Sequence, residues 1–455
     1  MCDNIQIPTN IDDYISKGIK KGKKKKSRRM IKRTSGACIF CILTFLLVGI
    51  RVSPVFAANA AKIPGLKYIV EIVRFDKGLT SAVENNYIQS INKSCEKQDI
   101  NFTVKDIIAD RFGIVVFYSV ENKSGYKYPR ISDPKLLDAK RSSLEMSSSY
   151  GFSHSDNMSY DGKIEFYFKN EDNRSNIIPD SVILQTSIEV DKTKALEEEA
   201  PTKYIDSSSA HVDNSEVLNS TWEVNIPIDK TKFSGMEKEY KIDQSVEIEG
   251  QKLFFKNIRI YPTRSILSVS FDKSNSKKIL ALEDLKLIDE KGQEWGRIAD
   301  GMTGTSSDEN SHELYFQSNY FQKPKELYLT GNSAMALDKK DCYFTVDTEK
   351  ERITFSPYDL LSITDFNIKD NVLRFEVEIN KKLGGRHYFL SNEALDANGN
   401  EIKIIESGSS NVENKSFCNY TLKLNDNFKG PIKFKINYYP SEIQGAFKVK
   451  IPLDN

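Results

Sequence analysis

The longest apolar stretch of the chain lies near its start. Residues 36–50 carry no charged side chain, and apolar residues resume after Arg51 and continue to Ala58. A helix that crosses a membrane needs about 20 residues, and the long side chain of Arg51 can reach the lipid headgroups at the outer end. The pattern therefore predicts one transmembrane helix over residues 36–58.

A cleaved signal peptide is the alternative for this segment, because its apolar core is short and small residues follow at Ala58-Asn59-Ala60. Such a cleaved chain would begin near Ala60 or Ala61. The 35 residues before the apolar stretch are longer than the charged region of a usual signal peptide, which favours a retained anchor.

Residues 59–95 are expected to form a juxtamembrane helical stalk. After Pro64-Gly65, apolar residues fall on one helical face at Leu66, Ile69, Val70 and Val73.

Beyond residue 95, apolar and polar positions alternate as in half-buried strands, and the pattern repeats three times. Each repeat has two strands with a polar break, then a turn containing Asp, a strand after a proline, and a strand ending in Asp. The turns start at Asp138, Asp289 and Asp396, the prolines are Pro179, Pro324 and Pro431, and the last strands cover 224–229, 343–347 and 449–454. From Asp106, Asn257 and Asp365 in the polar breaks to these turns the separations are 32, 32 and 31 residues.

Repeats of this size with many short strands are typical of immunoglobulin-like β-sandwiches. The expected modules are 96–235, with a polar insertion at 191–220, then 236–350 and 351–455. The fold class is therefore predicted as mainly β: one transmembrane helix followed by tandem immunoglobulin-like β-sandwich modules. Trp222 and Trp295 do not occupy corresponding places, so an antibody-type Cys-Trp-Cys pattern is absent.

Charge separates the two ends of the chain. Residues 1–35 hold eleven Lys and Arg against three Asp, a net charge of +8, which leaves −7 for the other 420 residues of a chain whose total is +1. Basic residues before an apolar span place that side in the cytoplasm. The prediction is a single-pass cell-membrane protein with a cytoplasmic N-terminus and an extracellular C-terminus, and a nucleic-acid partner is not expected.

The cytoplasmic tail carries the candidate partner-binding residues. After Pro8-Thr9-Asn10, which can cap a helix, apolar side chains line one helical face at Ile11, Tyr14, Ile15 and Ile19. A tail of this length has no core in which to bury that face, so the face can dock in the groove of a partner. The alternative is that the tail, whose basic residues run from Lys17 to Arg33, secures only topology and touches anionic lipid.

Motifs for catalysis, metal or cofactor binding are not found. The four histidines are dispersed at His154, His211, His312 and His387, away from the spacing of a zinc site. The segment Asp396–Asn400 has its glycine two places too early for a calcium loop and fits a hairpin turn. The chain is therefore predicted not to be an enzyme and to need no cofactor.

The cysteines do not suggest a disulfide framework. Cys38 and Cys41 lie inside the apolar span and are interpreted as packing thiols. Cys95, Cys342 and Cys418 are odd in number, although a bridge between Cys342 and Cys418 across modules stays open.

Several segments resemble a family of single-pass membrane proteins of Gram-positive bacteria that share an extracytoplasmic domain of unknown function. They are 7–15 with Gly18, 52–57, 63–70, 76–79 and 82–85. The segment Asp289 to Trp295 resembles an immunoglobulin-like domain of unknown function that is often appended to it.

The resemblance implies an anti-sigma factor, with an extracytoplasmic-function sigma factor bound by the tail. Thr34 stands where the histidine of a zinc-type anti-sigma motif would precede Cys38 and Cys41, so the contact would be metal-free. The predicted function is a non-enzymatic envelope signal sensor, whose outer modules bind an extracellular ligand or a cell-wall component that the sequence does not identify. The alternatives are a structural or adhesive surface protein without a regulatory partner and a secreted hydrolase with an unrecognised site.

Overall fold

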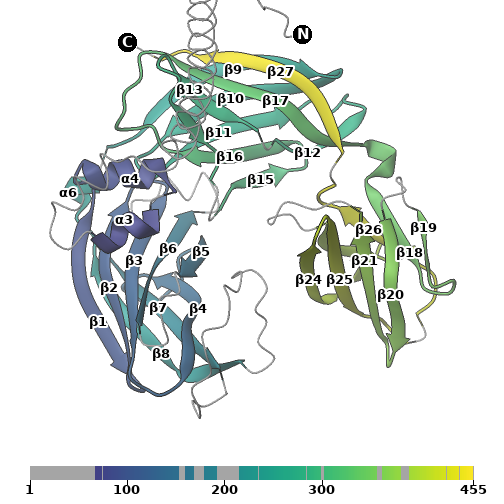
Figure 1. Ribbon diagram of the computed structural model, residues 1–455, viewed down its shortest axis with the longest axis horizontal. Coiled ribbons are helices and arrows are strands. Elements are labelled where there is room, and N and C mark those ends of the chain that lie inside the picture. Colours follow the sequence, from purple (N-terminus) through teal and green to yellow (C-terminus); the bar gives the residue numbers. More distant parts are fainter. Residues whose placement is uncertain are drawn as a thin grey trace, which may run out of the picture. The chain divides into compact units, whose positions relative to one another are not determined.

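The computed structural model describes residues 67–73, 75–152, 159–168, 179–191, 215–233, 235–282, 284–298, 302–355, 361–380, 389–426, 428–439 and 441–453 (Figure 1). The predicted tail 1–35, the predicted span 36–58 and most of the polar insertion 191–220 lie outside these residues. None of the helices within these ranges is long and apolar enough to cross a membrane.

Two short helices open the described chain, in place of one continuous stalk. The first, α3, spans Lys67–Val73 and buries Ile69 and Val73. The second, α4, spans Lys77–Glu84 and belongs to the compact unit Asp76–Asn455. The end of the predicted stalk, residues 89–95, lies instead in the first strand, β1.

The first module consists of two antiparallel sheets, with the orders β1-β2-β3-β6-β5 and β4-β7-β8. Its strands are β1 Gln89–Lys97, β2 Ile100–Ala109, β3 Gly113–Asn122, β4 Lys127–Leu137, β5 Met146–Phe152, β6 Ser159–Phe168, β7 Ser181–Asp191 and β8 Ser215–Pro227. The alternation predicted from the sequence is clearest in β7, where every second side chain is buried. Trp222 of β8 is fully buried and its Nε1 donates to the Ile100 carbonyl of β2 at 2.9 Å, which joins the two sheets.

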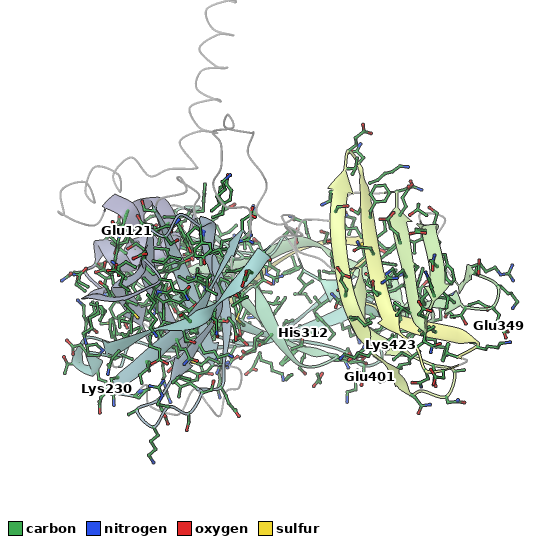
Figure 2. All side chains as sticks on the ribbon, turned by 90° about the horizontal axis from the view of Figure 1, so that it is seen from below. Glu121, Lys230, His312, Glu349, Glu401 and Lys423 are labelled. Atoms are coloured by element: carbon green, nitrogen blue, oxygen red, sulfur yellow. The ribbon has the colours of Figure 1, made fainter. Side chains whose placement is uncertain are left out.

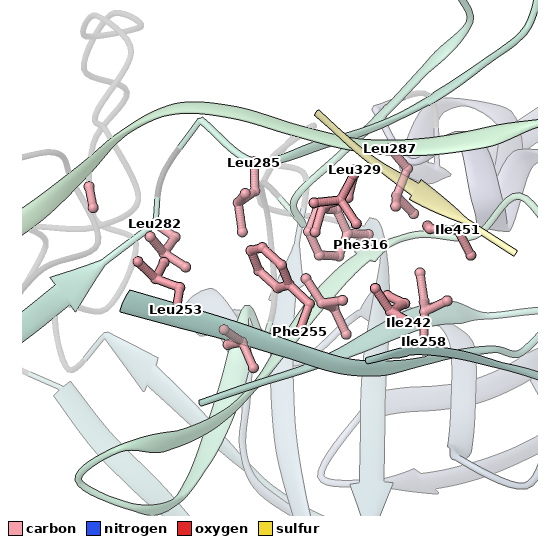
Figure 3. Close-up of a cluster of buried hydrophobic side chains, with 14 of the residues drawn as sticks. Ile242, Leu253, Phe255, Ile258, Leu282, Leu285, Leu287, Phe316, Leu329 and Ile451 are labelled. Carbon is pink, nitrogen blue, oxygen red and sulfur yellow. The ribbon is translucent and has the colours of Figure 1, made fainter. Parts of the chain in front are cut away.

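A short helix, α6 (Lys230–Phe233), leads to the second module. Its first strands are β9 Lys238–Ile248, β10 Gln251–Ile260, β11 Arg264–Phe271, β12 Lys277–Ala281, β13 Lys286–Asp289, β14 Glu294–Gly296, β15 Gly304–Asp308, β16 Ser311–Gln317 and β17 Leu327–Asp338. The sheet β15-β16-β11-β10-β9 faces the sheet β12-β17-β13-β14. Figure 3 shows their shared core, in which Phe255 and Phe316 of one sheet lie near Leu287 and Leu329 of the other.

The third module follows the 3₁₀ turn η1 (Lys339–Asp341). Its strands are β18 Tyr343–Asp347, β19 Arg352–Phe355, β20 Leu361–Lys369, β21 Val372–Ile379, β22 Leu390–Leu395, β23 Glu401–Ile402, β24 Ile404–Val412, β25 Lys415–Lys423 and β26 Pro431–Ile436. The sheets β19-β18-β26-β22-β23 and β20-β21-β25-β24 enclose an aromatic core that includes Phe344, Phe375 and Phe434. The prediction of a mainly β chain is confirmed.

The last strand, β27 (Glu442–Ile451), does not join the third module. It pairs antiparallel with β17 of the second module, with Ile451 opposite Leu327, and Figure 1 shows it in yellow beside β17. Ile443, Val449 and Ile451 are buried in the second core. The sequence predicts β18 as the last strand of the second module, but β18 pairs with β26 of the third module. The third module is thus inserted before the last strand of the second, whereas the sequence boundaries 236–350 and 351–455 place the modules one after the other.

The polar breaks that mark the repeats are β-bulges. The register of the strand pair shifts by one residue at Lys105 between β2 and β3, at Lys256 between β10 and β11, and at Thr364 between β20 and β21. A bulge leaves one residue unpaired and increases the local twist, so each module twists its central strand pair at the same place.

The Asp turns are also the same in all three modules. The side-chain Oδ1 of Asp138, Asp289 and Asp396 accepts hydrogen bonds from the backbone amides two and four residues later, at 2.7–2.9 Å. The residue three places on has a positive φ of 67° at Arg141, 76° at Gly292 and 84° at Gly399. Glycine adopts this conformation without steric cost, which explains its presence in two of the three turns.

Candidate functional site

Helix α4 begins at a capping aspartate, Asp76, which is also part of the candidate site. Asp76 Oδ1 accepts from the backbone nitrogens of Gly78 and Leu79 at 2.9 and 3.0 Å, which satisfies amides that the first helical turn leaves free. A Cβ on Gly78 would lie 2.5 Å from the backbone nitrogen of Ser318. The glycine therefore allows α4 to approach the loop after β16 of the second module.

The second carboxylate oxygen of Asp76 contacts Arg264, the first residue of β11. Arg264 Nη1 lies 2.6 Å from Asp76 Oδ2, and Nη2 lies 2.7 Å from Oε2 of Glu165 on β6. The Arg264 side chain is fully buried, and that of Glu165 is 1% exposed. One guanidinium thus joins α4, the first module and the second module. We call Asp76, Asp110, Glu165, Thr263 and Arg264 the arginine junction.

The neighbouring residue, Thr263, makes a second connection to the first module. Asp110, in the turn between β2 and β3, accepts from the Thr263 backbone nitrogen at 2.9 Å and from its hydroxyl at 2.6 Å, both on Oδ2. Oδ1 of Asp110 accepts from the backbone nitrogens of Phe112 and Gly113. Both oxygens of this fully buried carboxylate are therefore satisfied.

Aromatic rings pack around these polar groups. Phe112 stacks on Tyr167 at a centroid distance of 4.6 Å and meets Tyr315 edge-on at 5.1 Å. Arg264 lies over the Tyr167 ring at 5.6 Å, and the Tyr167 hydroxyl donates to Glu165 Oε2 at 3.0 Å. These rings keep water from the ion pairs, and inside such a low-dielectric environment charges interact strongly.

The electrostatics of the two buried acids differ. Burial by itself would raise the pKa of Glu165, but the positive charges of Arg264 and Lys163 outweigh it and hold that pKa at about 2. Burial raises the pKa of Asp110, and its hydrogen bonds from Thr263 only partly offset that effect. Of these two acids, Glu165 is therefore the one whose negative charge is stabilised by neighbouring positive charges.

The lowered pKa of Glu165 predicts a specific loss of stability in acid. Its folded pKa of about 2 lies below the ordinary value of 4.5, so its contribution is present above pH 4.5 and lost as pH falls towards 2. We expect Glu165→Gln to be less stable than the wild type at pH 5, and the gap between the two to shrink by about 3 kcal/mol by pH 2. Urea unfolding at steps between these pH values measures the gap.

Glu121→Gln is the control for this pH series, because Glu121 is exposed on β3 and its side chain pairs with Lys123, 3.4 Å away (Figure 2). Exposed pairs contribute about 0–1 kcal/mol, so this variant should stay close to the wild type. A gap between Glu165→Gln and the wild type that does not change with pH would contradict the assignment.

The arginine junction connects segments of the chain, since Arg264 binds Asp76 and Glu165 and Thr263 binds Asp110. In the ranges that the structure describes, no three His, Cys, Asp or Glu side chains are grouped to hold a metal ion. His312 lies apart on β16, with its Nδ1 2.8 Å from the Ser306 hydroxyl (Figure 2). The other three histidines lie outside the described residues.

The predicted partner-binding residues Ile11, Tyr14, Ile15 and Ile19 lie outside the described residues, so they stay a prediction. Cys342 and Cys418 are both free thiols, buried in the core of the third module. Burial raises the pKa of the Cys418 thiol to about 11, which disfavours the reactive thiolate. The possible disulfide between Cys342 and Cys418 does not form in this structure, and the two cysteines lie in the same module.

Sequence reasoning did not find the arginine junction. Arg264 stands at the start of a strand, where a charged side chain normally faces water, and its two acidic partners, Asp76 and Glu165, are far from it in sequence. One signal was present: Asp76 before Gly78 has the spacing of a helix cap, and both lie in a segment that carries the family resemblance.

Two regions of the chain match models of protein families, and both contribute residues to this site. Residues 25–122 match the model of a domain of unknown function (DUF4179), and residues 237–379 match a family of unknown function (DUF5643). Asp76 and Asp110 lie in the first match, and Thr263 and Arg264 in the second. The second match crosses from the second module into β21 of the third.

No curated protein matches the chain. Among solved structures, "The crystal structure of the conserved domain protein from Bacillus anthracis" is similar to 59% of this chain and 84% of that one, with 18% sequence identity and a TM-score of 0.39. The two matched regions agree with the resemblance of the sequence to domains of unknown function.

Proposed function

We propose that this chain is a non-enzymatic, single-pass envelope sensor of the anti-sigma type. In this proposal residues 36–58 span the cell membrane, immunoglobulin-like modules lie outside and bind an extracellular or cell-wall ligand, and the cytoplasmic tail binds a sigma factor. Neither a cofactor nor nucleic acid takes part.

The observation that carries the proposal is the arginine junction. Helix α4 follows the predicted span after fewer than 20 residues, and its capping Asp76 is ion-paired to the arginine that also holds Glu165. A buried ion pair is weak evidence for stability, but it restricts the geometry of the segments that it joins. A ligand that shifts the first two modules against each other would therefore also disturb the start of α4.

Further contacts hold α4 on the second module. Gln322 Nε2 donates to the Ser81 hydroxyl at 2.7 Å, and Lys77 Nζ donates to the Glu294 carbonyl at 2.7 Å. A movement of the modules would reach the predicted span through the short stretch of chain that precedes Asp76. Release of the tail from its partner, or cleavage near the stalk, would complete the signal.

The tail is tested by co-purification from detergent-solubilised membranes. We expect the full-length chain to recover a sigma factor, and Ile11→Asp with Tyr14→Asp and Ile15→Asp to recover at least tenfold less, because each carboxylate disrupts the apolar face that enters the partner's groove. Quantitative mass spectrometry of the recovered proteins measures the ratio.

A matched triple variant, Gln6→Asp with Asn10→Asp and Ser16→Asp, adds the same charge away from the predicted face and should retain the sigma factor. If the wild type recovers no sigma factor, or both triple variants recover it equally, the regulatory proposal fails. The modules would then fit the alternative of a structural or adhesive surface protein.

A further inference from the structure

A cavity of about 320 Å³ lies where the chain passes between the second and third modules. Its walls come from the end of β11, from β12, from the turn between β15 and β16, from the connection after β17, and from β26. A second cavity of about 290 Å³ shares Lys278, Glu309 and Lys435 with the first. These sizes are at the lower end of ligand-binding pockets.

Five lysines line the first cavity against two acidic residues, Asp272 and Glu309. They are Lys273, Lys277, Lys278, Lys339 and Lys435. Among the residues that the structure describes, no arginine contributes to its wall. The lining therefore has a formal charge of +3, although the whole chain is nearly neutral.

The internal partners of these lysines balance only part of their charge. Lys277 Nζ pairs with Asp338 Oδ1 at 2.9 Å, which leaves an excess of two positive charges. Lys278 of the second module and Lys435 of the third both approach one carboxylate, Glu309, and the Lys278 Nζ to Oε1 distance is 3.9 Å. Their side chains are only 23% and 24% exposed. Lys339 Nζ donates to the Lys273 carbonyl, which carries no charge.

Two partly buried ammonium groups that share one carboxylate repel each other. Burial lowers the pKa of Lys278, and the charge of Lys435 lowers it further. An anion in the cavity would relieve this repulsion. Lysine binds phosphate as a compact point charge, and an excess of two charges fits a ligand with more than one negative charge better than a single carboxylate.

We propose that this cavity binds a ligand that carries more than one phosphate group, either a free oligophosphate or a chain of phosphodiesters. The anion would lie between Lys278 and Lys435 and hold the second and third modules together, with Lys273 and Lys339 at its entrance. The proposal does not depend on the proposed function, because binding at this cavity needs neither the membrane span nor the tail.

The test is calorimetric titration of the full-length chain in detergent with sodium tripolyphosphate and, separately, with poly(glycerol phosphate). At least one probe should bind with a defined stoichiometry. Tighter binding of the first identifies a free oligophosphate, and tighter binding of the second identifies a phosphodiester chain. Absence of binding by both would overturn the proposal.

Variants show whether binding occurs in the cavity. Lys273→Gln with Lys339→Gln removes two exposed charges and should weaken binding about tenfold. Lys278→Gln with Lys435→Gln should abolish it, with circular dichroism as the check on folding.

Lys230→Gln with Lys423→Gln is the control, because it removes the same charge outside the cavity and should leave affinity unchanged (Figure 2). Equal weakening in the Lys273/Lys339 variant and this control would assign the binding to general charge attraction and overturn the site.

Discussion

Replacing Arg264 by methionine is expected to destabilise the first two modules by about 3–5 kcal/mol. Methionine has a similar volume, so the effect comes from charge. Glu165 and Asp76 would both lose their guanidinium partner, and Glu165, at 1% exposed, has almost no water to replace it. The positive charge that would remain beside Glu165 is that of Lys163.

Urea unfolding followed by tryptophan fluorescence measures this loss of stability in the first two modules. The chain has two tryptophans, Trp222 in the first module and Trp295 in the second, and the third module has none. The signal therefore reports on the two modules that the arginine junction connects.

Two further variants separate charge from geometry at Arg264. Arg264→Lys keeps the charge but lacks the planar fork that reaches two carboxylates, and should fall between the wild type and Arg264→Met. Arg141→Met is the matched control, because Arg141 is 58% exposed and pairs with Glu223; it should cost less than about 1 kcal/mol. Equal losses from Arg141→Met and Arg264→Met would contradict the role given to the arginine junction.

The second large effect concerns β27. Ile451→Ala and Ile443→Ala are each expected to cost about 2–5 kcal/mol, and the loss should fall on the second module, although both residues come from the end of the chain. Ile451 is 0% exposed and Ile443 is 4% exposed, both within the core formed by β9 to β17.

Hydrogen exchange read peptide by peptide locates the loss. Amides of β17 should exchange about 30-fold faster or more, since 2 kcal/mol corresponds to roughly that ratio, while amides of β25 in the third module keep their protection. Ile405→Ala and Ile368→Ala are matched controls on the third module, where these side chains are 52% and 41% exposed. Faster exchange in β25 and unchanged exchange in β17 would show that β27 belongs to the third module.

The local features of the modules could be predicted from the sequence because they depend on residues close together in the chain. The bulges at Lys105, Lys256 and Thr364 appeared as polar residues that interrupt an apolar alternation. The turns at Asp138, Asp289 and Asp396 appeared through the residue types that such turns require. Both features rest on backbone geometry over a few residues, and their even spacing made the repeat visible.

The assignment of the last strands was harder, although a signal for it was present. Val224-Asn225-Ile226-Pro227-Ile228-Asp229 closes the first module and closely resembles Val449-Lys450-Ile451-Pro452-Leu453-Asp454, whereas 343–347 lacks the Ile-Pro pair. The similarity indicates that β27 is the equivalent of β8 for the second module. Order along the chain favoured the other assignment, because consecutive strands usually pair.

The sequence by itself determined that the chain beyond residue 95 is built from related β-modules, since a period of two and the turn residues depend only on neighbours in the chain. Only the tertiary structure decided which strand completes which module and which charges meet. Edge strands with similar alternation can satisfy the same backbone hydrogen bonds, so the choice between β18 and β27 depends on the core that each side chain fills. Likewise, Arg264 is buried only because Asp76 and Glu165, 188 and 99 residues before it, reach the same place in the fold.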